Sequence, residues 1–224
     1  MNGTLTLAIE SGIENGSLSL MDGSSVLATW YGQPGLAASE KLLPAIADLL
    51  NSGGWDIYAV GRVAVSRGPG SYTGVRVGLA TALGLSRGRG IPCIGIDLMK
   101  AIYSRFGNGL AAICAIPIGR NGLCWTYFPA SGDALNQGIL GTGDRDDFVE
   151  SMRSKRETPI FAHSLVLPLL SAGDEFSDDP AIFDVGRNMA IYIGEASLSF
   201  DDGLEPIYAR TMTFATTSGE NVVK

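Results

Sequence analysis

"VAVSRGPGSYTGVRVGLATALGLSRGRGIPCIGID", residues 63–97, is the stretch that decides the fold. It begins within an apolar run, Val60 to Ser66, that is typical of a buried strand. A glycine-rich loop follows, then an apolar helix from about Thr73 to Arg87, and then a second buried strand in "IPCIGID". Strand, loop, helix and strand in this order predict one unit of a parallel α/β sheet.

The residues before and after this segment extend it into a whole lobe. "LTLAIES", Leu5 to Ser11, predicts a strand, and two alternating runs joined by an Asp22-Gly23 turn complete a three-stranded antiparallel meander. A helix is expected in "SEKLLPAIADLLNSGG" and a short one in "LMKAIYSRF". The order β-β-β-α-β-α-β-α over residues 1–106 matches the ribonuclease-H-like lobe of actin-like (ASKHA) α/β proteins.

The first of these helices carries two local expectations. Ser39 is a possible N-cap, and Pro44 requires either that the regular helix starts near Leu43 or that it kinks. Its apolar face is expected to contain Leu42, Ile46, Leu49 and Leu50.

After Gly107 the pattern starts again and predicts a second, smaller and degenerate α/β lobe over residues 107–210. Strands are expected in "LAAICAIPI", "GLCWTYF" and "TPIFAH", with a short helix in "DDFVESMRS". "IFDVGRNMAIYIGEASLSF" predicts one longer helix, and residues 211–224 are expected to form a flexible tail.

The composition excludes several classes of protein. The formal charge of −7, without a Lys/Arg cluster, excludes a chain that grips nucleic acid by itself. No apolar stretch is long enough for a bilayer and no leader pattern is present, so a cytoplasmic protein without membrane contact is expected. Cys93, Cys114 and Cys124 are far apart in apolar contexts, which indicates reduced core thiols.

Candidate catalytic residues are few. His163 is the one histidine, so two-His metal motifs are excluded, and its apolar surroundings indicate a packed side chain. Asp97 follows a strand and is expected to cap the next helix. Glu10, before Ser11 and Gly12, stands where actin-like kinases carry the Asp of a phosphate-binding turn. We therefore predict no catalytic residue and no metal site.

The glycine-rich loop has two interpretations. A loop between a strand and a helix can bind phosphate through free amides, which would involve Gly68, Gly70, Ser71, Thr73 and Gly74. The loop matches neither Walker A nor G-x-G-x-x-G. Alternatively, its glycines supply positive φ angles and close backbone approach, with Ser71 or Thr73 capping the helix.

The helix after the loop is unusually rich in small residues. Gly74, Gly78 and Ala82 recur at every fourth position, and Gly84 and Gly88 form a second such pair. Each interior glycine costs about 0.5–1 kcal/mol relative to alanine, so close packing on both sides of the helix is expected. Either another subunit or the chain's own first helix could provide that cover.

Four segments together resemble the TsaB (YeaZ) family: "LAIESGIENGSLSL", "SEKLLPAI", the segment that contains "SRGPGSYTGVR", and the closing "EPIYAR". The match is dense over about residues 5–100 and then sparse until Glu205 to Arg210. The resemblance implies a non-catalytic subunit that works with TsaD in making threonylcarbamoyladenosine in tRNA. ATP and tRNA would be engaged only by the complex, so no cofactor of its own is expected.

The resemblance also implies partners and a partner surface. Pairing with a TsaD-like subunit, or with a second copy when alone, would use the two helices of the N-terminal lobe, and a TsaE-like ATPase would dock where the larger subunits meet. The implied surface consists of Leu43, Ala47, Leu50, Gly74, Val75, Gly78, Leu79 and Ala82.

Three positions depart from the family pattern: Ala38 replaces a common His, Glu10 replaces Asp, and Pro117 replaces the Asp of a turn in the second lobe. These departures argue against nucleotide binding by this chain alone. The rival hypothesis is a small ATP-dependent kinase that uses Glu10, Ser11 and the glycine loop. A peptidase would need a nucleophile and base or a two-His site, which the sequence lacks.

Overall fold

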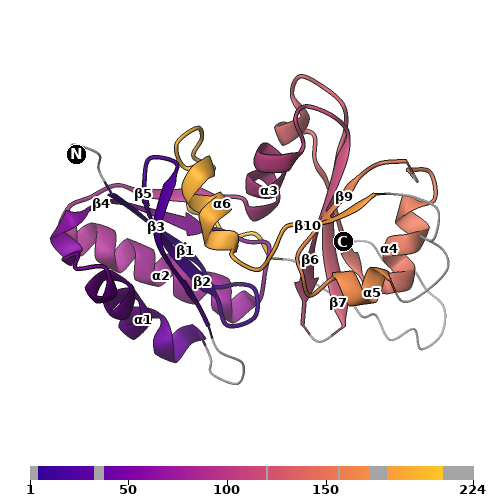
Figure 1. Ribbon diagram of the computed structural model, residues 1–224. Coiled ribbons are helices and arrows are strands. Elements are labelled where there is room, and N and C mark those ends of the chain that lie inside the picture. Colours follow the sequence, from indigo (N-terminus) through magenta and orange to yellow (C-terminus); the bar gives the residue numbers. More distant parts are fainter. Residues whose placement is uncertain (1–4, 33–37, 120, 156, 172–180, 209–224) are drawn as a thin grey trace.

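The computed structural model describes residues 5–32, 38–119, 121–155, 157–171 and 181–208, which form two five-stranded mixed sheets (Figure 1). The first sheet has the order β3-β2-β1-β4-β5, with an antiparallel meander extended by parallel strands. The predicted order of elements in this lobe is confirmed. Its elements are β1 (Leu5–Glu10), β2 (Ser17–Asp22), β3 (Ser25–Tyr31), α1 (Ala38–Ser52), η1 (Ile57–Ala59), β4 (Val60–Ser66), α2 (Tyr72–Arg89), β5 (Cys93–Ile96) and α3 (Leu98–Phe106).

The second sheet repeats the topology of the first. Its order is β10-β9-β6-β7-β8, again a meander extended by two parallel strands. This repetition confirms the predicted two-lobe actin-like fold, but the second lobe is less degenerate than expected, because β8 and β10 complete a five-stranded sheet. The elements are β6 (Ala112–Ile118), β7 (Gly122–Phe128), η2 (Ala134–Asn136), β8 (Ile139–Gly143), α4 (Arg145–Met152), β9 (Ile160–Ala162), α5 (Leu167–Leu170), β10 (Ile182–Asp184) and α6 (Met189–Ala196).

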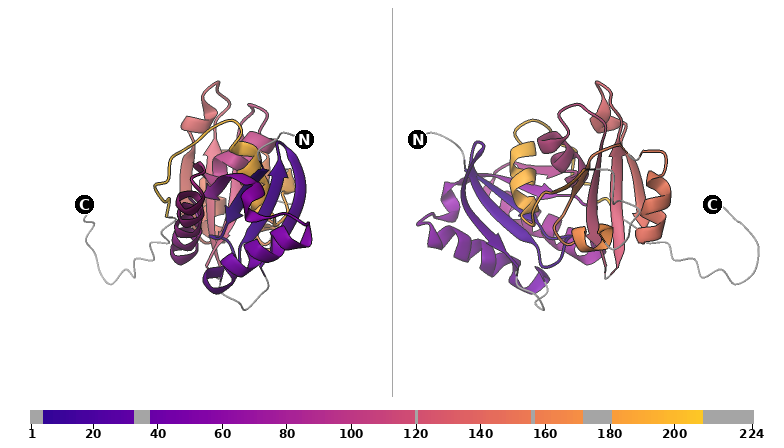
Figure 2. Two further views of the ribbon diagram at one scale, coloured as in Figure 1. Left: turned by 90° about the vertical axis from the view of Figure 1, so that its left-hand side faces the viewer. Right: turned by 45° about the vertical axis from the view of Figure 1, so that its right-hand side comes forward.

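The helices are arranged in layers around the two sheets. α1 and α2 lie side by side on the outer face of the first sheet, and α4 and α5 cover the outer face of the second (Figures 1 and 2). α3 and α6 pack against each other between the sheets, where they share one apolar core with both. α6 contacts β1, β2 and β4, whereas α3 contacts β6, β7 and β9, so each of these helices covers the sheet of the other lobe.

This exchange changes the division expected from the sequence. The boundary between residues 106 and 107 separates the two sheets along the chain. However, α6 lies within the expected second lobe, 107–210, and packs on the first sheet. The residues expected to form a flexible tail, 211–224, lie outside the described residues.

Two expectations about helices are wrong. "IFDVGRNMAIYIGEASLSF" is a short strand, a loop and α6 rather than one helix, because Gly186 adopts φ 79° and the Asp184 carboxylate binds the Gly186 amide at 2.7 Å. α1 runs from Ala38 through Pro44, which lies on its exposed side, so Ser39 is inside the helix and does not cap it.

Cys93, Cys114 and Cys124 are free thiols, the last two fully buried, as predicted. No helix in the described part of the chain is both long and apolar enough to cross a membrane.

The last described residues, 201–208, form a closing segment that returns to the first lobe. The Asp202 amide donates to the Gly95 carbonyl at 2.8 Å, and the Ile207 amide donates to the Arg67 carbonyl at 2.6 Å. The Asp202 carboxylate accepts from the Asp97 amide at 2.9 Å and pairs with Lys100 at 2.8 Å. The segment therefore covers the edge strand β5 and the start of the glycine loop.

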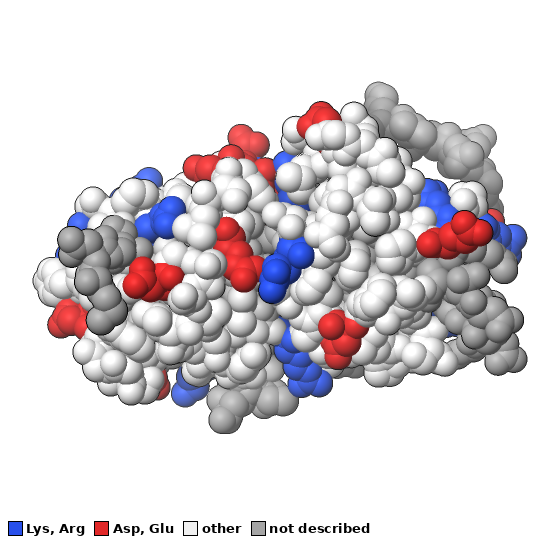
Figure 3. Space-filling view, turned by 45° about the horizontal axis from the view of Figure 1, so that its top comes forward, with Lys and Arg blue, Asp and Glu red and all other residues white. Residues whose placement is uncertain are grey.

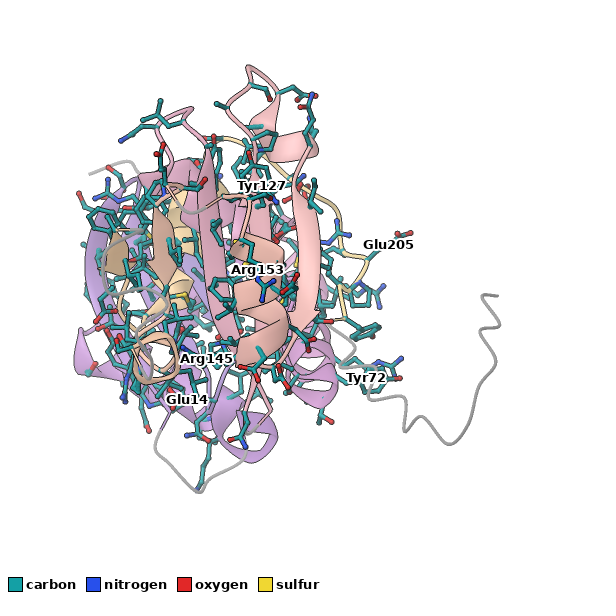
Figure 4. All side chains as sticks on the ribbon, turned by 90° about the vertical axis from the view of Figure 1, so that its right-hand side faces the viewer. Glu14, Tyr72, Tyr127, Arg145, Arg153 and Glu205 are labelled. Carbon is teal, nitrogen blue, oxygen red and sulfur yellow. The ribbon has the colours of Figure 1, made fainter. Side chains whose placement is uncertain are left out.

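We expect Asp202→Ala to lower the free energy of unfolding by about 1–3 kcal/mol, because the Asp97 amide and Lys100 lose a largely buried partner. Urea denaturation measures the change. Glu205→Ala, which alters an exposed carboxylate of the same segment (Figure 4), is the matched control and should change stability by less than about 0.5 kcal/mol. Equal stability of the two variants would contradict the importance of the Asp202 contacts.

Candidate functional site

The glycine loop packs directly on the turn between β1 and β2. The Ser71 amide donates to the Gly12 carbonyl at 2.7 Å, and the Ser11 hydroxyl donates to the Gly74 carbonyl at 2.8 Å. The Ser71 hydroxyl accepts from the Gly74 amide at 3.0 Å, which makes Ser71 the N-cap of α2. Of the two caps that the sequence allows, Ser71 is therefore correct and Thr73 is not.

The glycines of the loop allow close contact between the two backbones. A Cβ atom on Gly70 would lie 2.8 Å from the Gly12 Cα, and Cβ atoms on Gly74 and Gly78 would collide with Ser11. Gly68 alone among these loop glycines has a positive φ, at 99°. Close approach, rather than unusual torsion angles, thus explains most of the glycines in this motif.

Glu10 fills the place that a bound anion would need in the β1–β2 turn. Its carboxylate accepts from the amides of Gly12 at 2.5 Å and Ile13 at 3.1 Å, and the side chain is fully buried. Burial raises the pKa of Glu10 to about 7; the two amide hydrogen bonds oppose this shift, and the charge of Glu14 adds to it.

Three amides of the loop are engaged within the protein. The Gly68 amide donates to the Ser66 hydroxyl at 3.2 Å, and those of Ser71 and Gly74 have the partners described above. Of the residues considered for phosphate binding, Gly68, Ser71 and Gly74 therefore have amides that already donate within the protein. The phosphate role of this loop stays a prediction.

A cavity of about 300 Å³ lies between the lobes beside Glu10, and Glu14, Tyr31, His163 and Arg187 also line it. His163 is buried, its Nδ1 accepts from the Leu165 amide at 3.2 Å, and a backbone hydrogen bond at Arg187 also engages it. Burial, with the charge of Arg187, lowers the pKa of His163 to about 4, so the ring is neutral near pH 7. The expectation of a packed, satisfied histidine is confirmed.

Asp97 caps α3, as the sequence predicts. Its carboxylate accepts from the amides of Met99 at 2.8 Å and Lys100 at 3.2 Å. Within the described ranges, no three His, Cys, Asp or Glu side chains are grouped closely enough to hold a metal ion.

The partner surface implied by the resemblance needs correction. Of its residues, only Leu43, which is 58% exposed, and Ala47 are exposed on α1. The others cannot be presented to a partner because they pack on the sheet, on α1 or on the β1–β2 turn. These buried residues are Leu50, Gly74, Val75, Gly78, Leu79 and Ala82.

The exposed side of α2 carries a different set of residues. Arg76, Ala80, Gly84 and Gly88 are exposed and recur at every fourth position, and a Cβ atom on either glycine would meet open space. We call these four residues, with Leu43 and Ala47 of α1, the outer face. The spacing from Arg76 was visible in the sequence, but the spacing from Gly74 is equally regular, and only the packing tells them apart.

Gly78→Ala and Gly84→Ala form a matched pair within α2. We expect Gly78→Ala to lower the free energy of unfolding by about 1–3 kcal/mol, because the new methyl group collides with the Ser11 hydroxyl. Gly84→Ala should raise it by up to about 1 kcal/mol through helix propensity. Chemical denaturation measures both, and a neutral Gly78→Ala would contradict the close contact.

Glu10 predicts a pH-dependent stability. Because its pKa is about 7 in the folded chain and near 4.5 when unfolded, the folded state binds the proton more tightly. The contribution of Glu10 is therefore complete below pH 4.5 and is lost as pH rises to 7, by up to about 3 kcal/mol. Glu10→Gln should abolish this decline, whereas Glu14→Gln, in the same turn and exposed, should retain it. Denaturation measured between pH 5 and pH 8 separates the two outcomes.

Part of the chain is similar in sequence to known proteins. The family model described as TsaD, tRNA N6-adenosine threonylcarbamoyltransferase, matches residues 35–127. Escherichia coli TsaB, a tRNA threonylcarbamoyladenosine biosynthesis protein, is 34% identical over 96 residues, 43% of this chain and 41% of its own. The tRNA N6-adenosine threonylcarbamoyltransferase of Dinoroseobacter shibae is 33% identical over 122 residues, 47% of this chain and 34% of its own. The chain thus matches less than half of the length of these relatives.

A solved structure extends the likeness of fold to both lobes. YeaZ from Pseudomonas aeruginosa superimposes with a TM-score of 0.61 over 92% of this chain and 100% of its own, at 16% sequence identity. The same arrangement of two lobes is therefore present in a protein of that name. The chain is thus similar in sequence to proteins named TsaB over part of its length, and similar in fold to a protein named YeaZ over both lobes.

Proposed function

We propose that this chain takes part in threonylcarbamoyladenosine biosynthesis in tRNA as a non-catalytic partner of a TsaD-like protein. The observation that carries the proposal is the similarity to Escherichia coli TsaB over 96 residues, together with the TsaD family model, whose match to residues 35–127 includes the glycine loop and α2. The exposed outer face, made by the same two helices, supports a role in docking.

The geometry of the β1–β2 turn supports the non-catalytic part of the proposal. The carboxylate of Glu10 is folded back onto the amides of Gly12 and Ile13 rather than turned toward a metal or a phosphate. His163 is buried and neutral near pH 7, and Asp97 is engaged as a helix cap. Glu10, His163 and Asp97, the candidate acids and bases of the sequence, thus each have hydrogen-bond partners within the protein.

The outer face suits close packing against another helix. Ala47, Ala80, Gly84 and Gly88 project little or no side chain, so a partner helix could approach the backbone closely. Leu43 adds an exposed apolar side chain on α1. We propose this face as the docking site for the TsaD-like protein, and for a second copy of the chain when it is alone.

The remaining partners follow from the same proposal. tRNA would be bound by the complex, because acidic and basic side chains are interspersed on the face in Figure 3 and form no continuous basic surface there. A TsaE-like ATPase would join the two larger subunits, and ATP would enter only in that assembly. The chain would need no cofactor of its own and would act in the cytoplasm.

Docking and ATP turnover distinguish this proposal from the rival kinase. Size-exclusion chromatography with light scattering, on the chain mixed with the TsaD-like protein of its own organism, should give a complex, and the chain alone should hydrolyse no ATP. Gly84→Trp should abolish the complex without unfolding the chain, because the bulk lies on the outer face. Gly132→Trp, at an open position on the second lobe, is the control and should bind as the wild type does.

Two results would contradict the proposal. A complex formed equally well by Gly84→Trp would mean that docking uses another surface. No complex, together with ATP hydrolysis that Glu10→Gln removes, would favour the kinase.

A further inference from the structure

Arg76 is held on the surface by two tyrosines from distant parts of the chain. Its guanidinium carbon lies 3.9 Å from the ring centroid of Tyr72 and 5.6 Å from that of Tyr208. Its Nε donates to the Tyr208 hydroxyl at 2.8 Å, and the two rings lie 4.7 Å apart. Tyr72, at the start of α2, is 54% exposed (Figure 4), so the cluster is open to solvent.

In the described part of the chain, no carboxylate pairs with Arg76. Lys100 pairs with Asp202 and Arg105 with Glu195, whereas Arg76, like Arg89 on Tyr58, lies against a tyrosine ring. Among the residues that the structure describes, Arg76 contacts only the two neutral tyrosines. The hydrogen bond with Tyr208 raises the pKa of Arg76, so the side chain stays positively charged.

The position of Arg76 connects this charge with the outer face. It is the first residue of the Arg76, Ala80, Gly84 and Gly88 stripe, one helical turn from Ala80. The tyrosines restrict the rotamers of a long side chain before any partner arrives. An arginine that is already ordered loses less conformational entropy when it binds, and its planar group suits a carboxylate.

We propose that Arg76, oriented by Tyr72 and Tyr208, is the ionic anchor of the outer face and binds a carboxylate of the partner protein. This inference rests on the proposed function, in which the outer face docks on a TsaD-like protein. Tyr72 and Tyr208 act as positioning residues. The carboxylate would have to lie beside the end of α2 that carries Tyr72, because Ala80, Gly84 and Gly88 carry no charge.

A protein carboxylate fits this site better than an RNA phosphate does. Binding to a nucleic acid backbone normally requires several cations along one surface. Here Arg76 and the exposed Arg87 lie near the two ends of a face of small and apolar residues, on a chain with a formal net charge of −7. Such a face resembles the rim and core of a protein interface, in which a charged pair sets orientation.

The role of Tyr208 gives the closing segment a part in docking. Tyr208 follows Ile207, whose amide is fixed to Arg67 beside the glycine loop. The segment that closes the first lobe therefore also orients a side chain of the outer face. Tyr208→Phe removes the hydroxyl that accepts from Arg76 and leaves the ring, so it tests orientation separately from charge.

The test is isothermal titration of the TsaD-like protein with wild type, Arg76→Gln, Tyr208→Phe and Arg153→Gln. Arg153 is an exposed arginine of the second lobe (Figure 4) that pairs with Glu150, so its variant is the control for surface charge. At about 50 mM salt we expect Arg76→Gln to raise Kd about tenfold and Tyr208→Phe about threefold, with Arg153→Gln unchanged. At about 500 mM salt the difference should shrink, because exposed charges are screened. Thermal melting confirms that each variant is folded.

Equal binding by wild type and Arg76→Gln at low salt would overturn the anchor and leave the proposed function in place. If Arg76→Gln raised Kd by the same factor at both salt concentrations, the anchor would also be overturned, because an exposed ionic contact weakens as salt rises. Loss of tRNA binding by the complex, with unchanged affinity between the two proteins, would reassign Arg76 to RNA. Absence of binding by the wild type would overturn the proposed function itself, and the anchor with it.

Discussion

The contact on which the first lobe depends is the meeting of two backbones, at Gly12 in the β1–β2 turn and at Gly70 in the loop before α2. No side chain fits between them, and the hydrogen bonds made by Ser11 and Ser71 hold them together. This contact sets the height of α2 above the sheet. The buried and exposed sides of the helix follow from it, and with them the residues that a partner can reach.

Glu10 has one methylene group more than the aspartate that actin-like kinases carry in this turn, and the extra length changes the contacts that the carboxylate can make. A glutamate is long enough to bend back onto the amides that follow its own strand, where it acts as an internal anion. Burial raises the pKa of this carboxyl to about 7, and the two amides hold it within the turn. A position used for chemistry in the actin-like fold thus becomes part of the core.

The order of elements in the first lobe could be predicted from the sequence, because the spacing of apolar residues and the turn residues there agree with the packing in the structure. The sequence was insufficient for Gly78 and Gly84, since both belong to regular four-residue stripes and only the turn at Ser11 decides which stripe is buried. The prediction of one long helix from Ile182 was wrong for a related reason. The Asp184 carboxylate and the torsion angle of Gly186 end a strand inside an otherwise helical pattern. The cluster around Arg76 could not be predicted from the sequence, because its two tyrosines are 4 and 132 residues away along the chain.

The exchange of α3 and α6 has a consequence for how the chain can be made. The inner face of the first sheet, with Ala8, Ala64 and Ile96, is covered by a helix that ends at Ala196. During synthesis from the N-terminus, that face has no native cover until residue 196 has left the ribosome. The half of the chain that carries most of the family likeness is therefore not an independent folding unit. A fragment that contains only the first half of the chain would expose the apolar inner face of the first sheet, and such a surface binds chaperones or aggregates.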